Sequence, residues 1–283
     1  MKKITSDAEK VALANSVHEA YMEIFPTDSV EAKLDVLEPG SYVAVTCSPS
    51  KGIDETLDMS ERLAKRGFKI VPHIAAKMVK DETHLREIMA RLDDMPIVSL
   101  FVPGGDVPTP AGKYKKALDL LRDIAEFDHR FEDIGIAGHP EGHPSVDDDV
   151  LFAELVKKQE FSNYIVTQMC FKSNIIGNWV KEIRERGVEL PVWIGMPSVS
   201  ERTSLMKTSL RIGVGNSLRY LKNHGKIAAK LMMQKEYRPD DLLVGLAPYI
   251  ADPYYNIAGH HIYCFNAVEK AEQWRRDFLA ELQ

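Results

Sequence analysis

The 283-residue sequence predicts a (β/α)₈ TIM barrel that forms one domain over residues 1–283. Two observations support this fold class. Eight short apolar runs alternate with amphipathic segments of helical periodicity, and this order implies parallel strands joined by helices. The chain also has roughly the length of one such barrel, and no linker or shift in composition divides it. Eight units favour a closed barrel, and an open parallel sheet is the alternative.

Each expected strand is a brief and nearly continuous hydrophobic run, which is typical of a parallel strand covered on both faces. The expected strands are 21–25, 42–47, 69–74, 97–102, 133–138, 164–170, 191–196 and 261–265.

The segments between these runs have the periodicity of amphipathic helices. In the first of them Leu57, Met59 and Leu63 share one side, and Gly67 ends the run. Several segments begin with Asp or Ser, which can cap the first turn. The expected helices are 54–67, 82–92, 113–127, 147–159 and 173–187, with extra helices at 202–215, 217–234 and 240–250 between the seventh and eighth strands.

Composition limits the partners of the protein. A formal net charge of −6 and a pI near 5.9 give no broad basic surface, so we expect neither nucleic acid nor an anionic membrane as a partner. No run has the length of a signal peptide's apolar core or of a membrane span. We therefore expect a cytoplasmic protein that binds a small molecule, either as a monomer or as a homo-oligomer.

The chemistry of such a barrel lies at the carboxyl ends of its strands, and polar residues gather there. Glu23 lies among apolar neighbours in the first strand, where an ionised carboxylate is costly unless it is paired or solvated. It is interpreted as a general acid that holds a proton near neutrality, and an exposed glutamate on an edge strand is the alternative. Asp106 follows two glycines that let the backbone approach a ligand closely.

Other common sites are not indicated. His139 and His143 have the spacing of a helical zinc pair, but Pro140 and Gly142 argue against a helix between them. No third ligand has convincing local spacing, so we expect no metal. The sequence also lacks a G-x-S-x-G elbow, a G-x-G-x-x-G turn and a phosphate-binding G-x-x-x-x-G-K-[ST] loop.

Seven motifs, in order along the chain, resemble those of the methylenetetrahydrofolate reductase family. The most specific is A-G-H-P-E-G-H-P, which is close to the family's A-G-Y-P-E-x-H-P. The motifs are M-E-I-F-P (22–26), V-A-V-T (43–46), P-H (72–73), G-G-D-V-P (104–108), A-G-H-P-E-G-H-P (137–144), T-Q-M-C-F (167–171) and G-M-P-S (195–198).

The resemblance implies an oxidoreductase of one-carbon metabolism. The family reduces 5,10-methylenetetrahydrofolate to 5-methyltetrahydrofolate with electrons from NAD(P)H, normally through bound FAD. By position, Glu23 would be the acid that helps to open the methylene bridge, and Asp106 and Gln168 would bind the folate. The positions that would contact the cofactor are Thr46, His73, Gly105, His139, His143 and Lys157.

The sequence departs from the family where FAD is bound. The family's arginine before Gly-Asp is Gly104 here, and three positions that are polar in the family, on the helix after the fifth strand, are Val150, Ala153 and Val156. Losing these charge-assisted contacts would weaken FAD binding. Two alternatives follow: NAD(P)H delivers hydride directly to the folate, or FAD is retained through replacements such as Lys77 or Lys172.

The sequence leaves open the nicotinamide cofactor, the direction of the reaction, and whether the protein belongs to one of two other functional classes. It does not distinguish NADH from NADPH, because it has no dinucleotide fingerprint, and it does not fix the direction of the reaction. A folate-dependent methyltransferase barrel would use Asp106 and Gln168 without hydride transfer. A non-catalytic folate-binding relative is the third class, although binding alone does not require an acid at Glu23.

Overall fold

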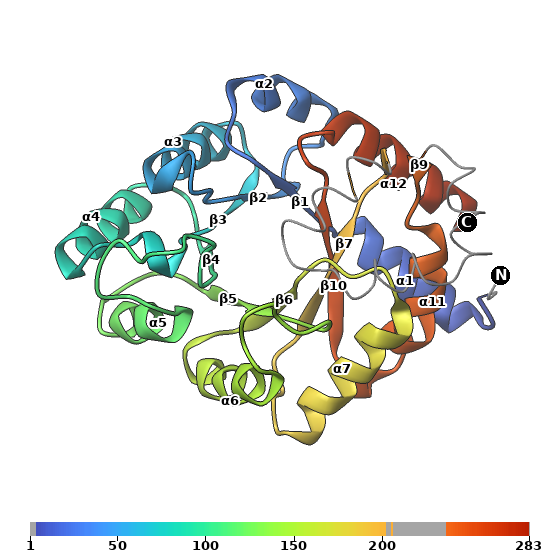
Figure 1. Ribbon diagram of the computed structural model, residues 1–283. Helices are drawn as coiled ribbons and strands as arrows, with labels where there is room; N and C mark the ends of the chain where they lie inside the picture. Colours follow the sequence, from blue (N-terminus) through green and yellow to red (C-terminus); the bar gives the residue numbers. More distant parts are fainter. Residues whose placement is uncertain (1–3, 202–204, 206–235, 283) are drawn as a thin grey trace.

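The computed structural model describes residues 4–201, 205 and 236–282, and it shows eight parallel strands surrounded by helices (Figure 1). The strands are hydrogen-bonded in the order β3-β2-β1-β10-β7-β6-β5-β4. Their bounds are β1 (Tyr21–Ile24), β2 (Tyr42–Val45), β3 (Lys69–Pro72), β4 (Ser99–Val102), β5 (Asp133–Gly138), β6 (Tyr164–Thr167), β7 (Val192–Pro197) and β10 (Ile257–Tyr263).

Hydrogen bonds between the ends of β3 and β4 close the barrel. His73 forms a parallel bridge with Phe101, and the N–H of Ile74 donates to the carbonyl of Phe101 at 2.9 Å. One step further, the N–H of Ala76 donates to the carbonyl of Pro103 at 2.9 Å. The predicted (β/α)₈ barrel is therefore confirmed, and the open sheet is excluded.

Helices cover the outside of the barrel, and the five predicted between the first seven strands are all present. Asp81 caps one of them, since its carboxylate accepts from the N–H of His84 at 2.9 Å. The helices are α1 (Asp7–His18), α2 (Asp28–Glu31), α3 (Gly52–Lys65), α4 (Glu82–Asp93), α5 (Ala117–Ala125), α6 (Asp148–Lys158), α7 (Ser173–Glu185), α11 (Asp240–Ala251) and α12 (Val268–Leu282).

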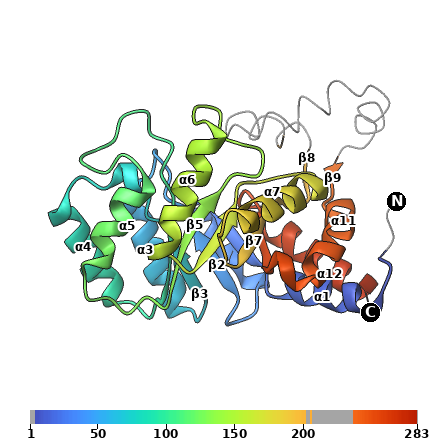
Figure 2. The ribbon, with the colours of Figure 1, turned by 90° about the horizontal axis from the view of Figure 1, so that it is seen from below.

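The interval between the last two barrel strands differs in part from the prediction. The helix expected at 240–250 is present as α11, and it packs against α1 and α7. A short antiparallel pair, β8 (Ser200–Glu201) and β9 (Glu236–Tyr237), was not predicted. The helices expected at 202–215 and 217–234 lie outside the described residues. Figure 2 shows β8 and β9 on the same side of the barrel as the loops that follow β4 and β5.

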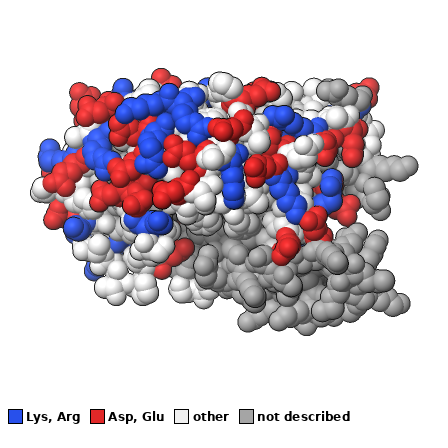
Figure 3. Space-filling model, turned by 90° about the horizontal axis from the view of Figure 1, so that it is seen from above, with Lys and Arg blue, Asp and Glu red and all other residues white. Residues whose placement is uncertain are grey.

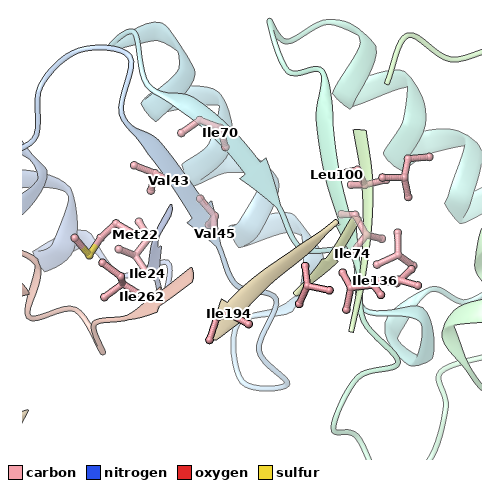
Figure 4. Close-up of a cluster of buried hydrophobic side chains, with 14 of the residues drawn as sticks. Met22, Ile24, Val43, Val45, Ile70, Ile74, Leu100, Ile136, Ile194 and Ile262 are labelled. Atoms are coloured by element: carbon pink, nitrogen blue, oxygen red, sulfur yellow. The ribbon is translucent and has the colours of Figure 1, made fainter. Parts of the chain in front are cut away.

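Alternating residues of each strand build two separate apolar layers. In β1, Met22 and Ile24 belong to the large cluster between strands and helices, part of which Figure 4 shows. Tyr21, one position away, belongs to a second cluster inside the barrel, formed by Tyr21, Ala44, Val71, Phe101, Tyr164 and Val166. Glu23 has the same parity as Tyr21 and therefore points inward.

The surface carries charges of both signs, as the composition predicts. On the face in Figure 3, Lys and Arg alternate with Asp and Glu among the coloured residues. Ion pairs at the surface include Arg91 with Asp58, 2.6 Å apart. Among the described helices, none combines the length and the apolar character needed to cross a membrane.

The tight contact between β6 and β7 gives a stability prediction. A Cβ atom on Gly195 would lie 2.0 Å from the carbonyl oxygen of Thr167, a backbone atom that cannot move aside easily. Gly195→Ala is expected to lower the free energy of unfolding by about 1–3 kcal/mol, measured by chemical denaturation. Gly104→Ala is the control, because a Cβ there meets nothing within 4 Å. Equal stability of the two variants would contradict the packing described.

Candidate active site

Glu23 and His261 form a hydrogen-bonded pair inside the barrel mouth. His261 Nε2 lies 2.9 Å from Glu23 Oε2, and the two side chains are 3% and 11% exposed. Glu23 is on β1 and His261 on the adjacent β10, where His261 pairs in register with Tyr21. The sequence predicted an inward carboxylate at Glu23 but not its partner. The structure identifies His261 as that partner.

His73 is the third polar side chain of this group. Its ring centroid lies 6.1 Å from that of His261 and 4.6 Å from that of Phe101. Burial, with the nearby His261, holds the pKa of His73 well below its usual range, so the imidazole is neutral at pH 7. Its Nε2 atom is buried and has no hydrogen-bond partner among the described residues.

The carboxylate of Glu23 and one ring nitrogen each of His73 and His261 all lie within 4.8 Å of one another. Two imidazoles and a carboxylate are a donor set that can hold a divalent metal ion. The sequence predicted no metal, and the two histidines that lie close together in it, His139 and His143, are not part of this group. The three residues identified by the structure come from separate strands, so no local spacing could reveal them.

A hydrogen bond between Tyr263 and Thr167 joins the end of β10 to the end of β6 at the mouth. The hydroxyl of Tyr263 donates to the carbonyl of Thr167 at 3.0 Å, and the N–H of Gly195 donates to Thr167 Oγ1 at 2.8 Å. Burial keeps the pKa of Tyr263 well above its usual range, so this hydroxyl remains a donor. Gln168 follows directly and is half-buried, with its side-chain oxygen accepting from the N–H of Met169 at 2.8 Å.

The other side of the mouth is formed by the loops after β3, β4 and β5. Gly105 has φ +92°, and a Cβ atom there would lie 3.1 Å from the Cβ of Ala75, which explains the glycine. Asp106 is exposed, and its charge acts on His143 together with that of Lys77. Burial is the main cause of the lowered pKa of His143, and Lys77 adds to it, whereas Asp106 opposes it.

A cavity of about 270 Å³ lies between the end of β5 and helices α6 and α7. His139 lines it, and burial lowers the pKa of His139 to about 3. Lys158 also lines it and donates to the carbonyl of Ala137 at 3.3 Å. Lys157, the lysine chosen from the sequence, instead has a 58% exposed side chain 3.7 Å from Glu154.

All the predicted site residues except Lys157 thus lie at one end of the barrel, in two groups. The first group lies on or directly after strands β1, β2, β3 and β6 and consists of Glu23, Thr46, His73 and Gln168. The second group lies on the loops after β4 and β5 and consists of Gly105, Asp106, His139 and His143. Lys157 is apart from both groups, on the exposed side of α6. The structure adds His261, Tyr263 and Lys158 to the candidate residues at this end, and the sequence did not indicate them.

The buried ammonium group of Lys158 leads to a pH-dependent stability prediction. Burial lowers the pKa of Lys158 from 10.5 to about 8, so folding disfavours its charged form. Lys158→Met should therefore raise the free energy of unfolding at pH 7 by about 1–3 kcal/mol. Between pH 8 and 10.5 the folded wild type loses this proton before the unfolded chain does, so the advantage of the variant should shrink.

Denaturation at pH 7 and at pH 10.5 would measure this difference, with the exposed Lys157→Met as the control. A gain in Lys158→Met that is the same at both pH values would contradict the burial penalty.

The chain is similar in sequence to known reductases. The family model described as "Methylenetetrahydrofolate reductase" matches residues 30–214, which is more than half of the chain. Among curated proteins, "Probable methylenetetrahydrofolate reductase (NADPH)" of Caenorhabditis elegans is 26% identical over 184 residues, covering 62% of this chain and 25% of that protein. "Methylenetetrahydrofolate reductase 1" of Schizosaccharomyces pombe is 30% identical over 138 residues, covering 47% of this chain and 21% of that protein.

The aligned part of the chain thus corresponds to about a quarter or less of each of these relatives. The family match begins at residue 30 and includes the loops after β2 to β7, where most of the predicted site residues lie. The chain therefore belongs to the methylenetetrahydrofolate reductase family.

Proposed function

We propose that this protein transfers a hydride from NAD(P)H to 5,10-methylenetetrahydrofolate, giving 5-methyltetrahydrofolate, or catalyses the reverse reaction. The observation that carries the proposal is the carboxyl group of Glu23, which lies inside the barrel mouth at 2.9 Å from His261. A reaction that opens an aminal bridge requires a proton donor at the nitrogen that leaves, and such a donor is useful only in a fixed position.

His261 and the backbone around Glu23 supply that fixed position. The hydrogen bond to His261 Nε2 orients one carboxyl oxygen. The thiol of Cys264 donates to the backbone carbonyl of Glu23 at 2.9 Å, which ties β1 to the end of β10. Glu23 would donate its proton as the bridge opens to an iminium, and hydride addition to the iminium carbon would then produce the methyl group.

Asp106 and Gln168 are the proposed folate-binding residues. Both follow strands of the same parallel barrel, β4 and β6, so they lie at the same end as Glu23. A carboxylate and an amide can together pair with the donors and acceptors of a pterin ring. The common rim supports one shared ligand, with the folate spanning the mouth from Asp106 toward the acid.

The residues at the mouth fit the polar edge of a flavin or nicotinamide ring. Thr46 Oγ1 and His73 Nε2 are both buried without a hydrogen-bond partner among the described residues. Such atoms are costly unless a ligand or water satisfies them. Ring binding at Thr46 and His73 therefore agrees with the roles proposed from the family.

The residues expected along the diphosphate of FAD do not fit that group. Val150 and Val156 are 50% and 37% exposed on α6, Ala153 is exposed as well, and Gly104 offers no charge. Lys158 lines the nearby cavity, where burial lowers its pKa to about 8. We therefore derive no step through FAD and propose that the nicotinamide delivers its hydride directly to the folate.

The first test replaces the acid. Glu23→Gln should lower folate-dependent NAD(P)H oxidation about 10²–10⁴-fold, because glutamine cannot donate the proton. The control is Glu126→Gln, an exposed residue at the end of α5, which should retain wild-type turnover. Full activity in Glu23→Gln would remove the acid from the mechanism, and no turnover in any protein would favour a methyltransferase or a binding protein.

The second test concerns the flavin. Freshly purified protein should lack the visible absorption of oxidised flavin, and adding FAD should not change the rate of NAD(P)H oxidation with methylenetetrahydrofolate. A stoichiometric flavin spectrum, or a rate that depends on FAD, would show that FAD binds despite the residues along α6.

A further inference from the structure

The group formed by Glu23, His73 and His261 has the chemistry and the geometry of a metal site. Its ligand atoms lie within 4.8 Å of one another. Ligands around a tetrahedral zinc ion lie about 3.3 Å apart, since each is about 2.0–2.2 Å from the metal. Glu23 and His261, at 2.9 Å, are already near that spacing, so small side-chain rotations would complete the site.

The ring nitrogen of His73 that lacks a partner in the described part of the chain also suits a metal ion. An imidazole binds a metal through a neutral ring nitrogen. His73 is buried, with 6% of its surface exposed, and its Nε2 has no hydrogen-bond partner among the described residues. A metal ion would give a buried polar atom of this kind the partner that the protein does not provide.

The group is not completely enclosed. The side chain of Glu23 is 11% exposed, whereas that of His261 is 3% exposed. Three protein ligands with an accessible fourth position are the arrangement of a reactive or inhibitory metal site, in contrast to a closed structural one. The ligands are nitrogen and oxygen without sulfur, a set that suits divalent ions of the zinc class.

We propose that Glu23, His73 and His261 bind one divalent transition-metal ion of the zinc class at the barrel mouth. The ion and the catalytic proton then compete for the same carboxylate, since a metal-bound Glu23 is held ionised. Binding itself does not depend on the proposed reductase activity. The effect of the bound metal on turnover does rest on the proposed reductase activity: Zn²⁺ inhibits turnover, and a chelator restores it.

The experiment measures binding and location separately on the full chain. Metal-free wild-type protein is titrated with Co²⁺, followed by its visible absorption, and Zn²⁺ is then added to displace it. One ion per chain is expected, and anomalous diffraction at the zinc edge of wild-type crystals should place it between Glu23, His73 and His261. The crystallographic measurement needs no variant, so it stays decisive if a variant fails to fold.

The variants assign the ligands. His73→Ala and His261→Ala, checked for folding by circular dichroism, should each weaken Co²⁺ binding at least about tenfold. The double variant His139→Ala/His143→Ala is the control, because it removes the other close pair of histidines at the mouth, whose rings are 5.4 Å apart, and should bind as the wild type does.

Three outcomes would overturn the proposal: no binding, an ion located away from Glu23, or equal affinity in the His261→Ala variant. Binding of one ion without any folate-dependent turnover in metal-free protein would contradict the reductase function and leave the metal site standing. Folate-dependent turnover without metal binding would contradict the metal site and leave the reductase function standing.

Discussion

Closure of the parallel sheet between β3 and β4 is the constraint on which the rest of the structure depends. Once His73 and Phe101 are bridged, each strand has an inside and an outside, and every second residue must enter an enclosed space. Apolar side chains fill most of that space, in the cluster that includes Tyr21 and Tyr164. Polar groups above this layer are thereby confined to the mouth, at the carboxyl ends of the strands.

Confinement gives these polar groups their properties. Burial makes the His73 imidazole neutral and keeps the Tyr263 hydroxyl protonated, as their shifted pKa values indicate. An unpaired carboxylate in the same space would carry a large desolvation cost, which the hydrogen bond to His261 reduces. The same three groups therefore favour either a held proton or a bound cation, and the two proposals for this site are alternative occupations of one set of atoms.

The two sides of the mouth differ in the structure that carries their polar residues. On the side of Glu23, Cys264 and Gly195 each donate a hydrogen bond to the neighbouring strand, and Tyr263 donates to Thr167 across β7. Together these bonds hold the strand ends in place. On the side of Asp106, the residues lie on the loops after β3, β4 and β5, where the charges of Lys77 and Asp106 act on His143. A fixed position for Glu23 opposite an exposed Asp106 is compatible with the proposed reaction, in which proton transfer needs fixed geometry and the substrate must still enter and leave.

The sequence by itself determined the barrel, the approximate place of all eight strands, and the inward carboxylate, because hydrophobic period and residue order encode them locally. It could not reveal His261 as the partner of Glu23, since that contact depends on the register between the first and last strands of the barrel. The assignment of Lys157 had a similar limit: adjacent helix residues point about 100° apart, and only packing shows that Lys158 and not Lys157 lines the cavity. Tertiary structure alone decided these points, because side chains distant in sequence share a site only after the sheet has closed.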